Sequence, residues 1–167
     1  AYANRTGFNV GGDVQVVDND AYRNTDFGIF VQSTGTTVKG GEVYGNGDDG
    51  IHTAFARQFK ITGVDIHDNK GSGIYIESSV NGDVFSNTIH NNSLGSPVAE
   101  IEVYGVAKVS TSSKSHDIRV TGNIITGSEQ STYGIRESNA VFDNSYTHNV
   151  ISHTQTGAVA ALASSKV

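Results

Sequence analysis

The sequence predicts an all-β fold, a right-handed parallel β-helix with about 22 residues in each coil. Three observations support this prediction. A short motif of glycine and alternating apolar residues returns at nearly constant spacing, and a second apolar motif runs in phase with it. The composition also fits a thin core with many turns, because the 167 residues include 20 Gly and one Pro and are only 36% hydrophobic.

The first motif consists of glycine, an apolar residue, any residue and usually a second apolar residue. Its early copies begin at Gly7, Gly28, Gly50 and Gly73, at spacings of 21, 22 and 23 residues. Two later copies, at 99–103 and 134–136, follow longer intervals, which indicates insertions near residues 92–99 and 105–117. When coils stack, these copies form one sheet, and we expect the glycines to stack at one corner.

The second motif supplies another strand in each coil. Its copies are 19–21, 41–43, 64–66, 87–89, 123–125 and 149–151, and four of the six begin with asparagine. Asparagine side chains stacked inside a solenoid bond to one another and to turn backbone that would otherwise be buried unpaired. We therefore predict a stabilising asparagine ladder in which Asn87 points inward.

A third, weaker strand lies between the two motifs, at 14–17, 59–61, 84–85 and 118–120. An antiparallel sandwich is the alternative fold, but hairpin strands would not keep two motifs in phase over six units. We expect six to seven coils, spaced about 4.8 Å apart, in a single domain over residues 1–167. Since the chain opens inside a repeat, we interpret it as a fragment that lacks N-terminal coils.

Charge and composition argue against several classes of partner. The formal net charge is −6 and Lys and Arg form no runs, which argues against nucleic acid. Without cysteine, the chain has no disulfide and no thiolate metal site. No apolar stretch approaches the roughly 20 residues of a membrane span, and no signal peptide is visible.

Strand alternation predicts a polar and aromatic strip on the outer face of the first-motif sheet. The residues that follow the inward apolar position form a first outward column: Asn9, Phe30, His52, Tyr75, Glu102 and Arg136. Two residues further on, a second column contains Gly11, Gln32, Ala54, Glu77, Tyr104 and Ser138. Exposed aromatic residues in register suit a linear sugar polymer, with polar groups binding its hydroxyls. An ordinary solvated sheet face is the alternative interpretation.

Catalytic residues are not identified, although His52 and Tyr75 on neighbouring coils are weak candidates for moving protons at a sugar carbon. Asp48 and Asp49 carry carboxylates of the kind that binds Ca²⁺, but an acidic turn is commoner. We therefore assign no metal site and no cofactor to this chain. His67, His90 and His153 are interpreted as structural or exposed. Lys108, Lys114 and His116, in the long insertion, are interpreted as part of a solvated loop or of a groove wall.

Four segments resemble the catalytic A-module of bacterial mannuronan C5-epimerases in sequence, order and spacing. They are Ala1–Val10 (AYANRTGFNV), Asp65–Asn69 (DIHDN), Thr121–Ser128 (TGNIITGS) and Ser131–Glu137 (STYGIRE). The resemblance covers nearly the whole chain. It implies a secreted, bacterial β-helix acting on alginate, in which β-D-mannuronate becomes α-L-guluronate within the polymer, with calcium possible in the parent enzyme.

This chain also departs from the family pattern. The family's catalytic Tyr, its Asp-Pro-His motif and a further Asp match no position here and would lie on coils before Ala1. Of the family's basic substrate contacts only Arg5 is matched, and others correspond to Asp48, Ala54 and Ser138.

Three functions therefore stay open: part of an alginate epimerase, a polyuronate lyase on the same scaffold, or a non-catalytic polysaccharide-binding β-helix. Whether the chain is itself an enzyme is left open, and no oligomeric state is predicted. The residues expected to bind the polysaccharide are Arg5, Asn9, Phe30, His52, Tyr75, Glu77, Glu102, Tyr104 and Arg136.

Overall fold

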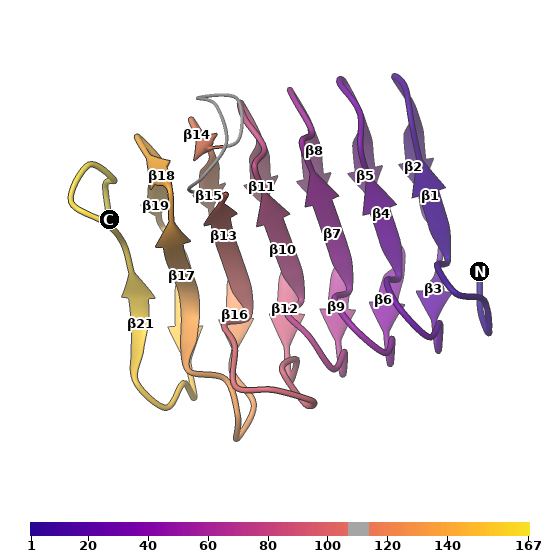
Figure 1. The fold of residues 1–167 in the computed structure, drawn as a ribbon. Helices are drawn as coiled ribbons and strands as arrows, with labels where there is room; N and C mark the ends of the chain where they lie inside the picture. Colours follow the sequence, from indigo (N-terminus) through magenta and orange to yellow (C-terminus); the bar gives the residue numbers. More distant parts are fainter. Residues whose placement is uncertain (107–113) are drawn as a thin grey trace.

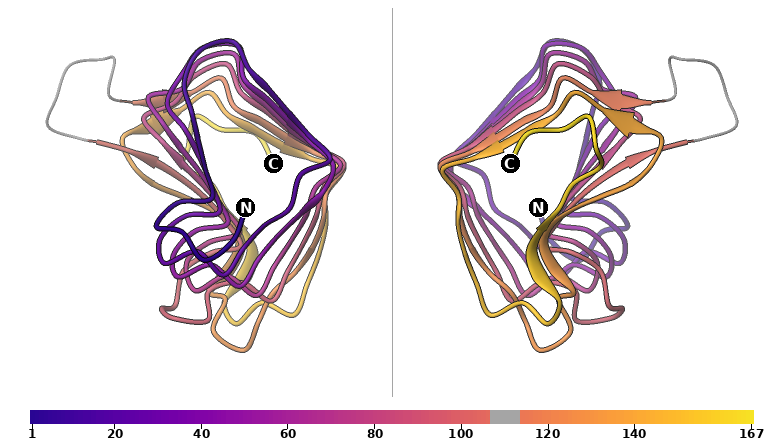
Figure 2. Two further views of the ribbon diagram at one scale, coloured as in Figure 1. Left: turned by 90° about the vertical axis from the view of Figure 1, so that its right-hand side faces the viewer. Right: turned by 90° about the vertical axis from the view of Figure 1, so that its left-hand side faces the viewer.

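The computed structural model describes residues 1–106 and 114–167. Within these residues the chain winds as coils that stack into a rod (Figure 1). Seen along the rod, each coil is a roughly three-sided loop (Figure 2). The strands form three long sheets that run along the rod, and neighbouring coils pair in parallel throughout. The predicted parallel β-helix is confirmed, and the antiparallel sandwich is excluded.

The first sheet has seven strands and is formed by the first motif. In order along the rod they are β1 (Phe8–Val10), β4 (Ile29–Val31), β7 (Ile51–Ala54), β10 (Ile74–Glu77), β13 (Ile101–Gly105), β17 (Tyr133–Asn139) and β21 (Gly157–Ala160). The last strand, β21, adds a coil after the final copy of the motif.

The other two long sheets have six strands each. The second sheet contains β2 (Gln15–Val17), β5 (Thr37–Lys39), β8 (Lys60–Thr62), β11 (Asp83–Phe85), β15 (Arg119–Thr121) and β19 (Ser145–Thr147). The third contains β3 (Ala21–Tyr22), β6 (Glu42–Tyr44), β9 (Asp65–His67), β12 (Thr88–His90), β16 (Ile124–Thr126) and β20 (Val150–Ser152). A small sheet pairs β14 (Ser115–His116) with β18 (Val141–Phe142).

A left-handed residue directly follows each strand of the second sheet, at the sharp turn to the third sheet. These residues, all with positive φ, are Asp18, Gly40, Gly63, Ser86, Gly122 and His148. Glycine adopts this conformation at little steric cost, and short polar residues tolerate it better than bulky ones. The turns keep successive strands at a fixed angle, so that every coil repeats the same outline.

The core is a set of aliphatic columns along the rod. On the first sheet, Ile29, Ile51, Ile74, Ile101 and Ile135 lie in register on successive coils. Each is at most 1% exposed. Full burial of such a side chain stabilises the fold by roughly 1.5–3 kcal/mol, so each coil is held mainly by its neighbours.

Glycines stack at the corner before the first sheet, as predicted. A Cβ atom added to Gly28 would lie 2.7 Å from the carbonyl oxygen of Gly50 and 2.5 Å from Cγ1 of Val43. Such distances leave no room for a side chain. The corner therefore requires glycine because the coils approach one another there through their backbones.

The predicted asparagine ladder is confirmed for the later coils. The side-chain amide of Asn87 donates to Oδ1 of Asn123 and to the carbonyl of Ile61, each at 3.0 Å, and its oxygen accepts from the backbone of Val64 at 3.0 Å. Asn123 continues the ladder to Asn149 at 2.9 Å. Asn19 does not belong to it, because that side chain is exposed at the N-terminal end of the rod.

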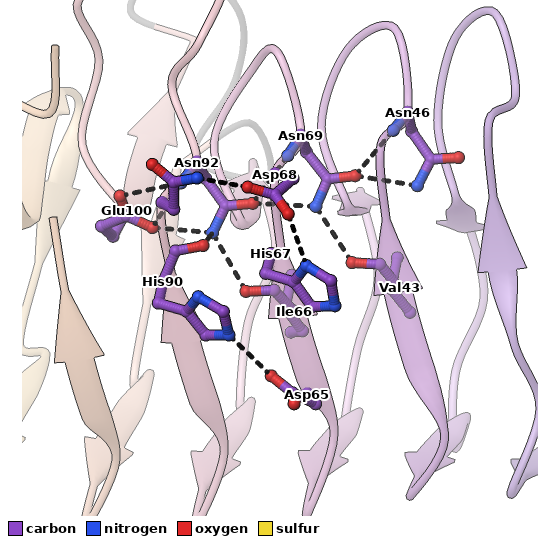
Figure 3. A network of polar contacts seen from close by, with 11 residues as sticks. Val43, Asn46, Asp65, Ile66, His67, Asp68, Asn69, His90, Asn92 and Glu100 are labelled. Carbon is purple, nitrogen blue, oxygen red and sulfur yellow. Dashed lines mark hydrogen bonds and ion pairs between the residues drawn. The ribbon is translucent and has the colours of Figure 1, made fainter. Parts of the chain in front are cut away.

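A second ladder, which the sequence analysis missed, lies at the turn before the first sheet (Figure 3). The amide of Asn46 donates to Asn69, and that of Asn69 to Asn92, each at 2.8 Å. The ladder ends at Glu100, whose Oε2 accepts from the Asn92 amide at 2.7 Å. A carboxylate only accepts hydrogen bonds, so it can end a ladder that donates toward it. Burial raises the pKa of Glu100, although its hydrogen bonds oppose that shift.

A second buried carboxylate holds the C-terminal segment. Oε1 of Glu137 accepts from the Tyr146 hydroxyl and the Ser165 hydroxyl, each at 2.6 Å, and from the Asn144 amide at 2.8 Å. The carbonyl of Lys166 accepts from the backbone N–H of Tyr146 at 2.8 Å. The segment 161–167 is thereby attached to the last coil of the second sheet.

Aromatic rings stack along the outer face of the third sheet. Ring centroids are 5.2 Å apart for Tyr2 and Tyr22, 5.0 Å for Tyr22 and Tyr44, 5.0 Å for Tyr44 and His67, and 4.9 Å for His67 and His90. His67 and His90 thus end strands β9 and β12 inside a stack. His153 is exposed, in the turn after β20.

Candidate functional site

The outer face of the first sheet brings the predicted first column together. Strand pairing places Phe30 beside His52, His52 beside Tyr75, and Tyr75 beside Glu102, which pairs in turn with Arg136. In the second column, Glu77 lies between Ala54 and Tyr104, and Tyr104 pairs with Ser138. We call these residues, with the turn residues that contact them, the outer strip.

His52 lies at the centre of the outer strip, between two carboxylates. Its Nδ1 is 2.9 Å from Oδ2 of Asp49, and its Nε2 is 3.3 Å from Oε2 of Glu77. Asp49 is fixed in the turn before β7, because its other oxygen accepts from the backbone N–H of Ser72 at 2.8 Å. Only 12% of the His52 side chain is exposed.

The two carboxylates favour the charged form of His52. A neutral imidazole has one N–H, so one carboxylate would then face a nitrogen lone pair. Burial lowers the pKa of His52, but the hydrogen bonds and charges of Asp49 and Glu77 outweigh it, and the pKa is raised. A general base needs a free lone pair. In this arrangement both nitrogens of His52 face carboxylates, so the imidazole is placed to donate on both sides and not to act as a free base.

Three aromatic rings surround the imidazole. Its centroid lies 4.5 Å from Phe27, 5.3 Å from Phe30 and 4.9 Å from Tyr75. These distances are within the range of cation–π attraction. The Tyr75 ring is inclined by only 26° to the imidazole, so the two rings stack along the rod and present their edges outward.

Tyr75 remains a neutral phenol over the ordinary pH range. Burial raises the pKa of its hydroxyl, and the negative charges of Glu102 and Glu77 raise it further. Its ring centroid is 6.0 Å from that of Tyr104. The Tyr104 hydroxyl in turn accepts from the side-chain amide of Asn139 at 3.2 Å.

Glu102 lies beneath the C-terminal part of the outer strip and is only 2% exposed. Its Oε2 is 2.7 Å from Nε of Arg136, and its Oε1 accepts from the Ser138 hydroxyl at 2.5 Å. Burial raises the pKa of Glu102, although Ser138 and Arg136 oppose the shift. One side of the Arg136 guanidinium is thus bound to Glu102, and the Arg136 side chain is 30% exposed.

The N-terminal part of the strip begins with Arg5, whose Nε lies 2.7 Å from Oδ2 of Asp26 and whose side chain is 88% exposed. Asp48 lies beside Asp26, in the equivalent turn of the next coil. Burial, and then the charge of Asp49, raise the pKa of Asp48. Arg5, like His52 and Arg136, is paired with a carboxylate.

Sequence reasoning placed the columns correctly but missed several partners. Phe27, Asp26 and Asn139 contact the strip without belonging to either column. Phe27 occupies the turn position before Gly28 that Asp49 occupies before Gly50, so aligning these positions would have found both. Glu102 and Ala54 are buried rather than open to solvent, at 2% and 5% exposure. Asn9 is exposed at the N-terminal end of the strip.

The basic residues of the long insertion lie elsewhere in the fold. His116 stacks on Phe142 in the small sheet, with ring centroids 4.7 Å apart, and Nζ of Lys114 lies 5.7 Å from the same ring. Lys108 lies outside the described residues. Within 1–106 and 114–167, no cluster of three or more His, Cys, Asp or Glu is arranged as a metal site. Calcium in a parent enzyme stays a prediction.

The solved structures that are similar to this chain include two A-modules. The A-module of mannuronan C-5 epimerase AlgE4 from Azotobacter vinelandii matches with a TM-score of 0.92 and 25% identity, over 99% of this chain and 49% of that one. The AlgE6 A-module from the same organism matches with a TM-score of 0.91 and 28% identity, over 98% and 47%. The chain thus spans about half the length of these modules. The resemblance inferred from sequence is confirmed.

The remaining findings concern related sequences, membrane spans and the sequence family. No curated protein sequence matches the chain. Its described residues contain no helix long and apolar enough to cross a membrane. Residues 2–151, which include strands β1 to β19, match the sequence family described as the right handed beta helix region. The parallel sheets and this match together show that the chain belongs to the right-handed β-helix family.

Proposed function

We propose that this chain is part of a mannuronan C5-epimerase-like module and that its outer strip holds alginate. One observation carries the proposal: aromatic and ionisable side chains stand in register on the first sheet of a solenoid that resembles two mannuronan C-5 epimerase A-modules over nearly its whole length. We propose polysaccharide binding for this chain itself. The epimerase reaction is proposed as the activity of the larger module.

The chemistry of the strip suits a polymer of sugar acids. Polar groups such as the Tyr104 hydroxyl exchange hydrogen bonds with sugar hydroxyls, and the exposed parts of Arg5 and Arg136 bind carboxylates. The Tyr75 and His52 rings are stacked along the rod, so a ligand meets their edges, and the edge of the Tyr75 ring carries the positive part of the ring quadrupole. These edges favour oxygen-rich groups over the apolar face of a sugar.

Epimerisation at C5 requires a neutralised carboxylate, a base that takes the C5 proton and an acid that returns one to the opposite face. Tyr75 is a neutral phenol that carries a proton, but the raised pKa of its hydroxyl makes it a weak acid. His52 does not fit the role of a base while both its nitrogens face carboxylates. We therefore propose that the strip supplies binding and that proton abstraction uses groups other than His52.

A non-catalytic polysaccharide-binding β-helix is the second candidate function. It is favoured by the pairing of Arg5, His52 and Arg136 with carboxylates of the chain itself. No observation favours a polyuronate lyase. In either case we propose a secreted bacterial protein, on the basis of the similarity to the two epimerase modules.

Calorimetric titration with an oligomannuronate tests the proposal. We expect Tyr75→Ala to weaken binding by about two- to tenfold, since an aromatic contact contributes roughly 0.5–1.5 kcal/mol. The matched control is Tyr44→Ala, which removes a stacked tyrosine from the outer face of the third sheet. No heat at millimolar ligand, or equal effects of the two variants, would remove the strip as the binding site.

A further inference from the structure

We propose that Nε2 of His52 is a binding point for a uronate carboxylate and that Glu77 occupies this point until the ligand displaces it. The inference rests on the proposed function, because it names the group through which the outer strip would recognise an acidic sugar. It assigns to Glu77 the part of an internal competitor that stands in the place of the ligand.

The two contacts of His52 are unequal, and the inequality marks the exchangeable one. The contact to Asp49 is 2.9 Å long, and the Asp49 side chain is 9% exposed and fixed by the Ser72 backbone. The contact to Glu77 is 3.3 Å long, and the Glu77 side chain is 27% exposed. Glu77 can therefore turn into solvent while Asp49 holds the imidazolium in place.

Exchange of one carboxylate for another leaves the number of hydrogen bonds to the imidazolium unchanged. The ligand carboxylate takes the N–H that Glu77 leaves, and Glu77 regains its hydration. Phe27, Phe30 and Tyr75 surround the imidazole and limit the access of water to it. A charge-assisted hydrogen bond is stronger in such surroundings than in bulk solvent.

The other two basic groups of the strip are less suited to this exchange. Arg136 contacts Glu102 at 2.7 Å, and Glu102 is 2% exposed, so that carboxylate has no path into solvent. Arg5 is 88% exposed, and a fully solvated ion pair contributes little to binding. His52 is the basic group whose partner is both loosely held and able to leave.

The protonation state of His52 makes ligand binding depend on pH. The groups around His52 are Asp49 and Glu77 on its nitrogens, Tyr75, Phe27 and Phe30 on its ring, and, nearby, Asp48. The charge of Glu102 acts on Tyr75. A ligand carboxylate binds only while the imidazolium keeps its Nε2 proton. Binding should therefore weaken as the pH rises through the raised pKa of His52.

The test compares Glu77→Ala with Glu42→Ala. Glu42 is exposed on β6 of the third sheet, so both variants remove one carboxylate and change the net charge equally. We expect Glu77→Ala to bind an oligomannuronate about three- to tenfold more tightly than Glu42→Ala, since an internal competitor is removed. Binding of a neutral manno-oligosaccharide should not show this gain. In a His52→Gln background the gain should vanish, because the imidazolium is gone.

A second readout does not depend on the ligand. ¹⁵N NMR titration of the imidazole should show a lower pKa for His52 in Glu77→Ala than in Glu42→Ala, since a stabilising carboxylate has been removed. Equal affinities of the two variants for the oligomannuronate, or a gain that persists in the His52→Gln background, would overturn the inference while leaving the proposed function intact. Absence of binding by the wild type and every variant would instead overturn the proposed function.

Discussion

Asn87 is buried with three hydrogen bonds from its side-chain amide, two donated and one accepted. We expect Asn87→Ala to lower the free energy of unfolding by about 1–3 kcal/mol, because the Val64 N–H and the Ile61 carbonyl lose a partner inside the rod. Urea denaturation followed by circular dichroism measures the change. Asn19→Ala is the control, since Asn19 is exposed and outside the ladder. An equal midpoint for the two variants would contradict a stabilising ladder.

Glu100 should make stability depend on pH in a defined direction. Burial raises its folded pKa above the ordinary value of 4.5, so the stability from this group is fully present below about pH 4.5 and is lost as the pH rises through the folded pKa. The free energy of unfolding of the wild type, relative to Glu100→Gln, should therefore fall from acid toward neutral pH.

Urea titrations at several pH values measure this difference, with Glu42→Gln as the control because Glu42 is exposed. A difference that grows with pH would show that the ionised carboxylate is the preferred form. In that case the hydrogen bonds from Asn92 and Ser131 would outweigh the burial of the charge.

At the scale of elements, Glu137 links β17 to the C-terminal segment 161–167. We expect Glu137→Ala to destabilise the attachment of this segment by about 1–3 kcal/mol, because buried donors on Tyr146 and Asn144 lose their acceptor. Hydrogen exchange at the Tyr146 amide, which bonds to the Lys166 carbonyl, should become faster. Glu129→Ala, an exposed carboxylate variant, should leave that amide protected. Unchanged exchange in Glu137→Ala would refute this role.

The elements were predictable where the repeat was regular. Each copy of the first motif became a strand of the first sheet, because glycine and the inward aliphatic residue are required at fixed positions in every coil. Strands β5 and β19 were missed, since each has one inward residue, Val38 or Tyr146, in a polar segment. The second ladder was also missed. It begins at Asn24, whose side-chain amide donates to Asn46 at 2.9 Å, and spacings of 22, 23 and 23 residues mark Asn24, Asn46, Asn69 and Asn92 in the sequence.

The candidate site was predictable only in part. Alternation along a strand decides which side chains face outward, so His52, Tyr75 and Glu77 were placed correctly. It does not decide which of them form pairs, because pairing depends on side-chain rotamers and on turn residues from other coils. The contact of Asp49 with His52 and the burial of Glu102 depend on such choices.

For the whole molecule, net charge predicts how binding depends on salt. The formal net charge is −6, so a polyuronate is repelled at long range while its local contacts are attractive. The Debye length falls from about 30 Å at 0.01 M salt to about 8 Å at 0.15 M. We expect affinity for an oligomannuronate to rise over this range in calorimetric titrations. Affinity that falls steeply with salt would indicate that unpaired basic groups dominate binding.

The central claim is that the outer face of the first sheet holds the polysaccharide. Amide NMR of the ¹⁵N-labelled chain during titration with an oligomannuronate tests it most directly, because every strand reports separately. The account predicts that the shifts cluster on β4, β7, β10, β13 and β17, centred on His52 and Tyr75, while the second and third sheets stay unchanged. Shifts confined to those two sheets, or no shifts at millimolar ligand, would contradict it.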